Sequence, residues 1–142
     1  MFFKKLFSFF RGGSKADKLN EQGKRLIESA RAENPRDDRK YSKAINLFKQ
    51  AMADDAKNIE TLINLGAALC DSESYEMAVL VLQQAEAQGS DDAHMFYNMG
   101  AAMMHISSDS RTNAHFYFKK AENQPRPSSA LRALYDYQTR EQ

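Results

Sequence analysis

The chain has 142 residues, of which 42% are hydrophobic and 27% are charged, and its formal net charge is +1. This length fits one domain with a real core, and the near-neutral charge gives no general case for nucleic-acid binding. The single cysteine, Cys70, excludes an internal disulfide and is compatible with a reducing, cytoplasmic compartment. No apolar run approaches the roughly 18 to 20 residues that a helix needs to span a bilayer.

Residues 2–11, with the sequence FFKKLFSFFR, form a basic amphipathic segment. Lysines interrupt its apolar residues, which is not typical of a secretory signal, and a Gly-Gly-Ser joint follows it. We expect it to lie in an anionic membrane surface, at the cytoplasmic face; packing on its own domain, binding of a protein partner and disorder are the alternatives. On a helix the apolar face would hold Phe2, Phe3, Leu6, Phe7, Phe9 and Phe10, and the polar face Lys4, Lys5 and Arg11.

From residue 16 onward the chain shows three pairs of predicted helices, each with the same alternation of large and small apolar residues. Small residues stand where two helices cross closely, and large residues stand where side chains interdigitate. The middle pair reads Leu62-x₂-Leu65-Gly66-x₂-Leu69 and then Ala78-x₃-Leu82-x₂-Ala85. The corresponding positions are Leu19, Gly23, Leu26, Ala44, Phe48 and Ala51 in the first pair, and Phe96, Met99, Gly100, Met103, Ala114, Phe118 and Ala121 in the third.

The spacing of these positions indicates a repeat. Ala51 to Gly66 and Ala85 to Gly100 are both 15 residues apart. The first pair carries about nine additional residues near residues 31–39, relative to the spacing within the middle pair. This insert is rich in charges of both signs and contains an Asn-Pro step, so we expect a solvated projection, formed by a longer first helix or a longer turn.

This pattern resembles the tetratricopeptide repeat family. The resemblance implies an all-α solenoid of helical hairpins with about seven helices. A Gln-Pro-Arg-Pro sequence ends the third pair, and an amphipathic helix after it is expected to cap the open end of the stack. The expected units are the tail and joint at 1–15, repeats near 16–55, 58–89 and 92–124, and a capping helix near 128–141.

The resemblance also implies a concave groove, lined by the first helix of each pair, that holds an extended peptide or a partner helix. Two asparagines recur at the same place in successive repeats, and an amide both donates to and accepts from a ligand backbone. The alternative is that these amides face solvent or neighbouring loops. The candidate groove residues are Asn20, Lys24, Ile63, Asn64, Ala67, Cys70, His94, Tyr97, Asn98, Ala101, Met104 and His105, with Glu21, Ile27, Glu60 and Asp71 on the same faces.

No catalytic or metal-binding constellation is predicted. His94 and His105 are eleven residues apart on one predicted helix, about 16 Å along its axis, which is too far to share a metal. Cys70 is expected to be a small buried apolar residue. We therefore predict a non-enzymatic adaptor or scaffold, without cofactor, that binds a protein segment. The alternatives are a small secretion-type chaperone for an apolar client, and homotypic assembly in which the tail of one subunit fills the groove of the next.

Overall fold

The computed structural model describes residues 13–33 and 37–124, and the described part is all-α. Six helices follow one another along it without a strand. The N-terminal tail and the expected capping helix lie outside the described residues. The helices are α2 (Lys15–Ala32), α3 (Asp38–Asp54), α4 (Ile59–Asp71), α5 (Tyr75–Ala87), α6 (Ala93–Ile106) and α7 (Ser110–Glu122).

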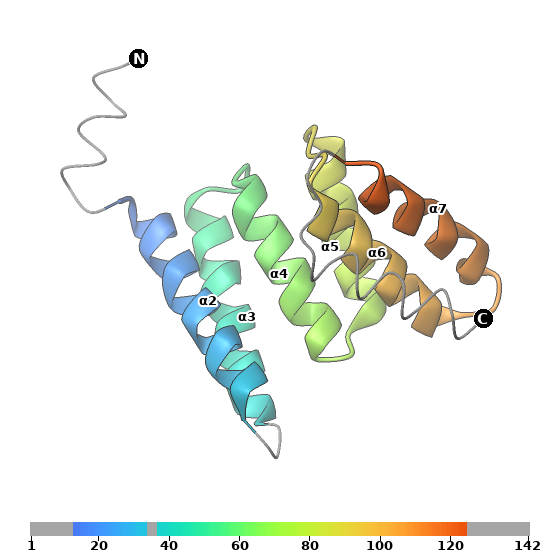
Figure 1. The fold of residues 1–142 in the computed structure, drawn as a ribbon. Helices are drawn as coiled ribbons and strands as arrows, with labels where there is room; N and C mark the ends of the chain where they lie inside the picture. Colours follow the sequence, from blue (N-terminus) through green and yellow to red (C-terminus); the bar gives the residue numbers. More distant parts are fainter. Residues whose placement is uncertain (1–12, 34–36, 125–142) are drawn as a thin grey trace.

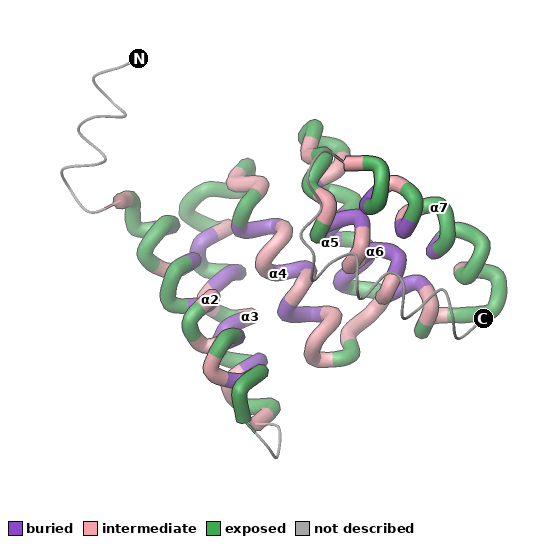
Figure 2. The backbone as a smooth tube through the Cα atoms, viewed as in Figure 1, coloured by how far each residue is buried: buried purple, intermediate pink, exposed green. Residues whose placement is uncertain are grey.

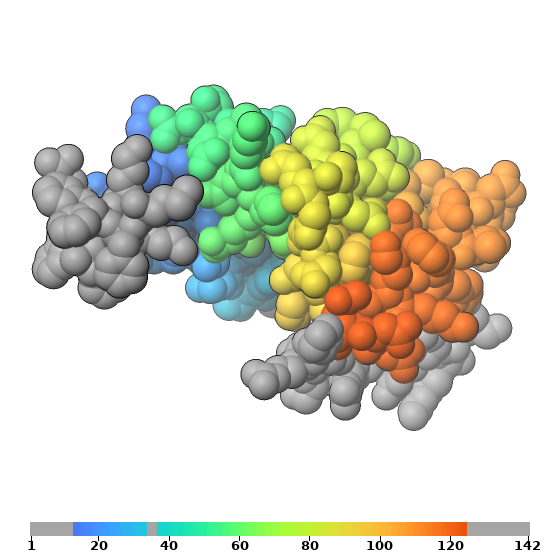
Figure 3. Space-filling view, turned by 90° about the horizontal axis from the view of Figure 1, so that it is seen from above, coloured from blue at the N-terminus to red at the C-terminus, as the bar shows by residue number. Residues whose placement is uncertain are grey.

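The helices pack as three consecutive hairpins, α2 with α3, α4 with α5 and α6 with α7, and each hairpin also contacts the next one (Figure 1). Seen from above, the hairpins succeed one another from the blue end of the chain to the red end (Figure 3). The first helices α2, α4 and α6 are therefore parallel and begin at the same end of the molecule. This arrangement confirms the predicted all-α class and the sequential hairpin packing.

One glycine in each hairpin marks the point of closest helix approach. A Cβ atom on Gly66 would lie 2.3 Å from Cδ2 of Leu82, and one on Gly23 would lie 2.5 Å from the ring of Phe48. A Cβ atom on Gly100 would lie 2.7 Å from the ring of Phe118. Each large partner is almost completely buried. The predicted small-to-large contacts thus hold the two helices of every hairpin together.

The first hairpin is longer than the other two. Its helices have 18 and 17 residues, whereas α4, α5 and α7 have 13 and α6 has 14. The inserted residues therefore extend both helices of the hairpin, and the segment between α2 and α3 spans only residues 33–37. The predicted projection is thus mainly helical.

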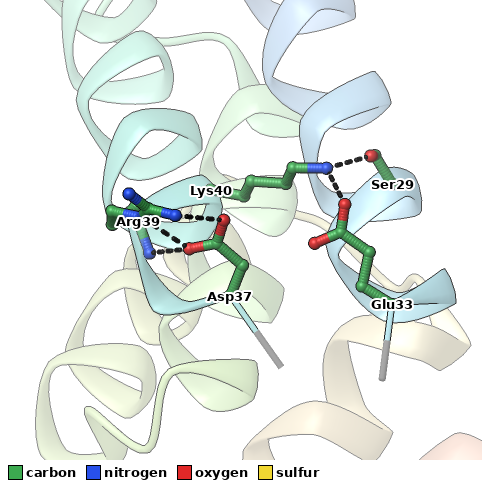
Figure 4. Close-up of polar contacts among 5 residues, drawn as sticks. All are labelled: Ser29, Glu33, Asp37, Arg39 and Lys40. Carbon is green, nitrogen blue, oxygen red and sulfur yellow. Dashed lines mark hydrogen bonds and ion pairs between the residues drawn. The ribbon is translucent and has the colours of Figure 1, made fainter. Parts of the chain in front are cut away.

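Polar contacts support the far end of this hairpin. Lys40 on α3 contacts Glu33 and donates a hydrogen bond to the Ser29 hydroxyl on α2, over 2.7 Å (Figure 4). Arg39 forms an ion pair of 3.1 Å with Asp37, whose carboxylate also accepts the backbone N–H of Arg39. Together these contacts cap α3 and tie it to the last turn of α2.

The ends of the other helices follow from local sequence. Side chains of Asn58 and Asp92 accept backbone N–H groups at the starts of α4 and α6. Asp109 is the residue before α7, but the hydroxyl that accepts the Ser110 N–H belongs to Ser107. Between them, the caps satisfy donors that the helices themselves leave unpaired.

Buried residues of all six described helices form one core cluster that runs through the stack, and their backbone positions are purple in Figure 2. Phe48, Leu62, Leu82, Met99 and Phe118 are among its members, each 0 to 1% exposed. On the second helix of each hairpin, buried alanines precede and follow the large residue: Ala44 and Ala51 around Phe48, Ala78 and Ala85 around Leu82, and Ala114 and Ala121 around Phe118. The core therefore uses only one face of α4 and of α6, and the residues on the other face of each helix are half-buried or exposed.

Candidate partner-binding groove

The candidate groove positions on α4 and α6 form one open face on each helix. We define the groove face as Glu60, Ile63, Asn64, Ala67, Cys70 and Asp71 on α4 with His94, Tyr97, Asn98, Ala101, Met104 and His105 on α6. All twelve residues are half-buried or exposed, whereas every buried residue of the two helices lies at another position. The 3.6-residue period therefore separates the groove face from the packing face.

Two asparagines join α2 to α4 along this face. Nδ2 of Asn64 donates a hydrogen bond to Oδ1 of Asn20 over 3.0 Å. Asn20 is only 3% exposed, so its amide belongs to the packing between α2 and α4 and not to an open groove surface. Replacing Asn64 would leave the buried Asn20 oxygen without this partner, at a cost of about 1 to 3 kcal/mol.

Ion pairs flank the asparagine pair on both sides. Nζ of Lys24 lies 3.1 Å from Glu21 and 3.6 Å from Glu60, and the hydrogen bond to Glu21 raises the pKa of Lys24. Arg31 reaches Asp71 over 2.7 Å. The sequence did not point to Arg31, because its pairing depends on the longer α2. These exposed ion pairs contribute little stability. Glu21 and Glu60 nevertheless neutralise the charge of Lys24, the only lysine among the candidate groove residues.

Cys70 lies where α4 meets α6. Its thiol donates to the backbone carbonyl oxygen of Asn98 over 3.5 Å. Burial, with a smaller contribution from Asp71, raises the pKa of the Cys70 thiol to about 12. A half-buried thiol with this pKa is almost entirely protonated at neutral pH, which favours a packing role over nucleophilic chemistry.

We expect Cys70 to react slowly with a thiol reagent in the folded protein. A pKa that rises from 9.0 to about 12 lowers the thiolate fraction at pH 8 roughly a thousandfold, and only the thiolate attacks. Labelling by Ellman's reagent should therefore be at least a hundredfold slower in buffer than in denaturant. Equal rates in the two conditions would show that Cys70 is open to solvent.

The α6 side of the groove face is aromatic. The Tyr97 ring packs against Phe118 with centroids 5.6 Å apart, and desolvation raises the pKa of Tyr97. His105 stacks on Tyr75 of α5 with centroids 4.4 Å apart, whereas His94 is exposed near the start of the helix. Ala101 and Met104 are half-buried between these aromatic residues. The face therefore offers apolar floor area with a few polar groups at its ends.

A cleft of about 500 Å³ lies at the start of the groove face, between the first turns of α4 and α6. Half-buried Ile59 and Ile63 contribute apolar surface, and Asn64 and His94 contribute polar groups. Three carboxylates also line the cleft, those of Glu60, Asp91 and Asp92.

The amphipathic tail, residues 2–11, lies outside the described residues, so its membrane contact stays a prediction. Among the helices at 15–32 and 38–122, none has both the length and the apolar character to cross a membrane.

Comparison with known proteins identifies the repeat. Residues 36–99, from just before α3 into α6, match the family model described as tetratricopeptide repeat. A search of curated proteins found no match. The three hairpins continue the same packing on both sides of the matched stretch. The chain therefore carries tetratricopeptide repeats over residues 36–99, a fold that generally serves as a protein–protein interaction module.

Proposed function

We propose that this protein is a non-enzymatic adaptor that holds a peptide or helix of a partner protein on its groove face. The observation that carries the proposal is that twelve half-buried or exposed residues share one face on α4 and α6, separated by position from every buried residue of both helices. Rigid helices can present such a face without rearrangement, which reduces the entropy cost of binding.

The chemistry of the face favours an apolar anchor on the partner. Ile63, Tyr97, Ala101 and Met104 are partly buried apolar groups, and methionine adapts to ligands of different shape. Asn98 provides an amide at the middle of α6 for one backbone contact. Because Asn64 is bonded to Asn20, Asn98 is the better of the two recurring asparagines for a partner contact.

Site-specific photocrosslinking in the native host tests this proposal. A benzophenone amino acid at Tyr97 should capture a discrete partner, because Tyr97 lies on the groove face, whereas the same probe at Phe116 should not. Phe116 is 56% exposed on α7 and does not belong to the groove face, so it controls for exposure. Ala101→Glu should lower the Tyr97 crosslink at least tenfold by placing a charge on the apolar floor, a change of about 1.4 kcal/mol.

Ala53→Glu, at an exposed position of α3, is the matched charge control and should leave the crosslink unchanged. Capture only from Phe116, or equal capture in the Ala101→Glu variant, would contradict the groove. The captured protein also separates adaptor from chaperone. A chaperone would suppress aggregation of that client, whereas an adaptor would leave its solubility unchanged.

A further inference from the structure

The cleft between the first turns of α4 and α6 has a distinctive charge. Among the described residues that line it there are three carboxylates and no lysine or arginine. Asp92 uses one oxygen to accept the Met95 N–H, and Glu60 lies 3.6 Å from Lys24. Asp91 is exposed, and no lysine or arginine within residues 13–33 and 37–124 forms an ion pair with it. The rim of the cleft is therefore acidic, while Ile59 and Ile63 make part of its floor apolar.

One segment of this chain has the complementary chemistry. Residues 2–11 contain Lys4, Lys5 and Arg11 with six apolar side chains and no acid. Apolar side chains would cover the isoleucines, and the basic side chains would face the carboxylates. The C-terminal residues 125–142 are a poorer match, because Asp136 and Glu141 stand among their basic residues.

The tail is also attached at the same end of the molecule as the cleft. It joins the described chain at Gly13, just before α2, and α2, α4 and α6 all begin at this end (Figure 1). Packed helices lie about 8 to 10 Å apart, so the cleft is about 10 to 20 Å from the start of α2. The eleven residue steps from residue 2 to Gly13 span up to roughly 36 Å when extended and about 16 Å when helical. An extended tail can therefore reach the cleft over this whole range of distances, and a helical tail can reach it over the shorter part.

We propose that residues 2–11 occupy this cleft in their own molecule and thereby regulate the groove. This inference rests on the proposed function, since the tail would compete with an external partner for the same face. A tethered segment acts at an effective concentration near the millimolar range, so even a weak contact would be populated. A partner, or an anionic membrane that attracts the same basic residues, would then have to displace the tail.

Paramagnetic broadening in the full chain tests the contact. A nitroxide on Ser8→Cys, in a Cys70→Ala background, should broaden the amide resonances of Ile63, Asn64 and His94 to less than half their intensity. Glu60→Lys combined with Asp91→Lys should restore these intensities by reversing the rim charge. The matched control is Glu76→Lys, which changes an exposed acid in the first turn of α5 and should leave the broadening intact. Raising the salt concentration should weaken it.

Mixing spin-labelled chains with isotope-labelled, unlabelled chains separates the possible occupants. No broadening in the mixture is expected for an intramolecular contact, and broadening there would overturn the proposal in favour of a second copy. Unbroadened cleft resonances in the spin-labelled chain would also overturn it, whether or not the tail binds vesicles containing anionic lipid. The adaptor function would survive either result, because the Tyr97 crosslink reports capture of a partner whether or not the tail occupies the cleft.

Discussion

We expect the Gly66→Leu variant to lose about 1 to 3 kcal/mol of unfolding free energy. A Cβ atom at this position would lie 2.3 Å from Cδ2 and 2.4 Å from Cγ of Leu82, which is completely buried. The branch point of a buried leucine cannot move without shifting α5, so overpacking outweighs the roughly 1 kcal/mol of helix propensity gained on replacing glycine. Chemical denaturation followed by helical circular dichroism measures the loss.

Ala67→Leu is the matched control for this substitution. It adds a similar side chain at the next residue of α4, but on the half-buried groove face. Its unfolding free energy should stay within about 0.5 kcal/mol of the wild-type value. Equal stability of Gly66→Leu and the wild type would refute the close approach of α4 and α5.

The second large effect is expected at Phe118. Phe118→Ala should cost about 3 to 5 kcal/mol, since the ring is 1% exposed and fills the space above Gly100. Its removal also takes away the contact with Tyr97. Denaturant titration at constant slope would give the change in stability directly.

A phenylalanine two residues earlier provides an internal comparison. Phe116 is 56% exposed, and its ring contacts Tyr117 edge-on with centroids 5.2 Å apart. Phe116→Ala should therefore cost less than about 1 kcal/mol. Similar losses for the two variants would mean that α7 is rotated relative to the arrangement described above.

Much of this fold was predictable because its packing residues recur at fixed intervals. Equal spacings from Ala51 to Gly66 and from Ala85 to Gly100 set two hairpins in register, and the glycine contacts with Leu82 and Phe118 follow from that register. The family resemblance implied which residues of α4 and α6 line the groove, and the helical period explains why these residues lie apart from the packing residues. Both inferences depend only on positions within a helix or hairpin.

Other features depend on distances between repeats and could not be predicted in this way. The hydrogen bond from Asn64 to Asn20 and the ion pair from Arg31 to Asp71 cross from α2 to α4, and they require the actual offset of the two helices. The insert was visible in the sequence, but its division between α2 and α3 was not. An Asn-Pro step predicts where a helix ends and does not predict how far the next helix extends.

The long first hairpin gives the chain a favourable order of assembly. Isolated helices shorter than about 12 to 15 residues are marginal in water, whereas α2 and α3 have 18 and 17. In a linear array, the stability of each hairpin is the sum of contacts within the hairpin and contacts with its neighbours. The first hairpin has additional contacts of its own, the hydrogen bond from Lys40 to Ser29 and the ion pair of Asp37 with Arg39. It leaves the ribosome before the other two. The N-terminal hairpin can thus serve as the template on which the shorter, less autonomous hairpins fold.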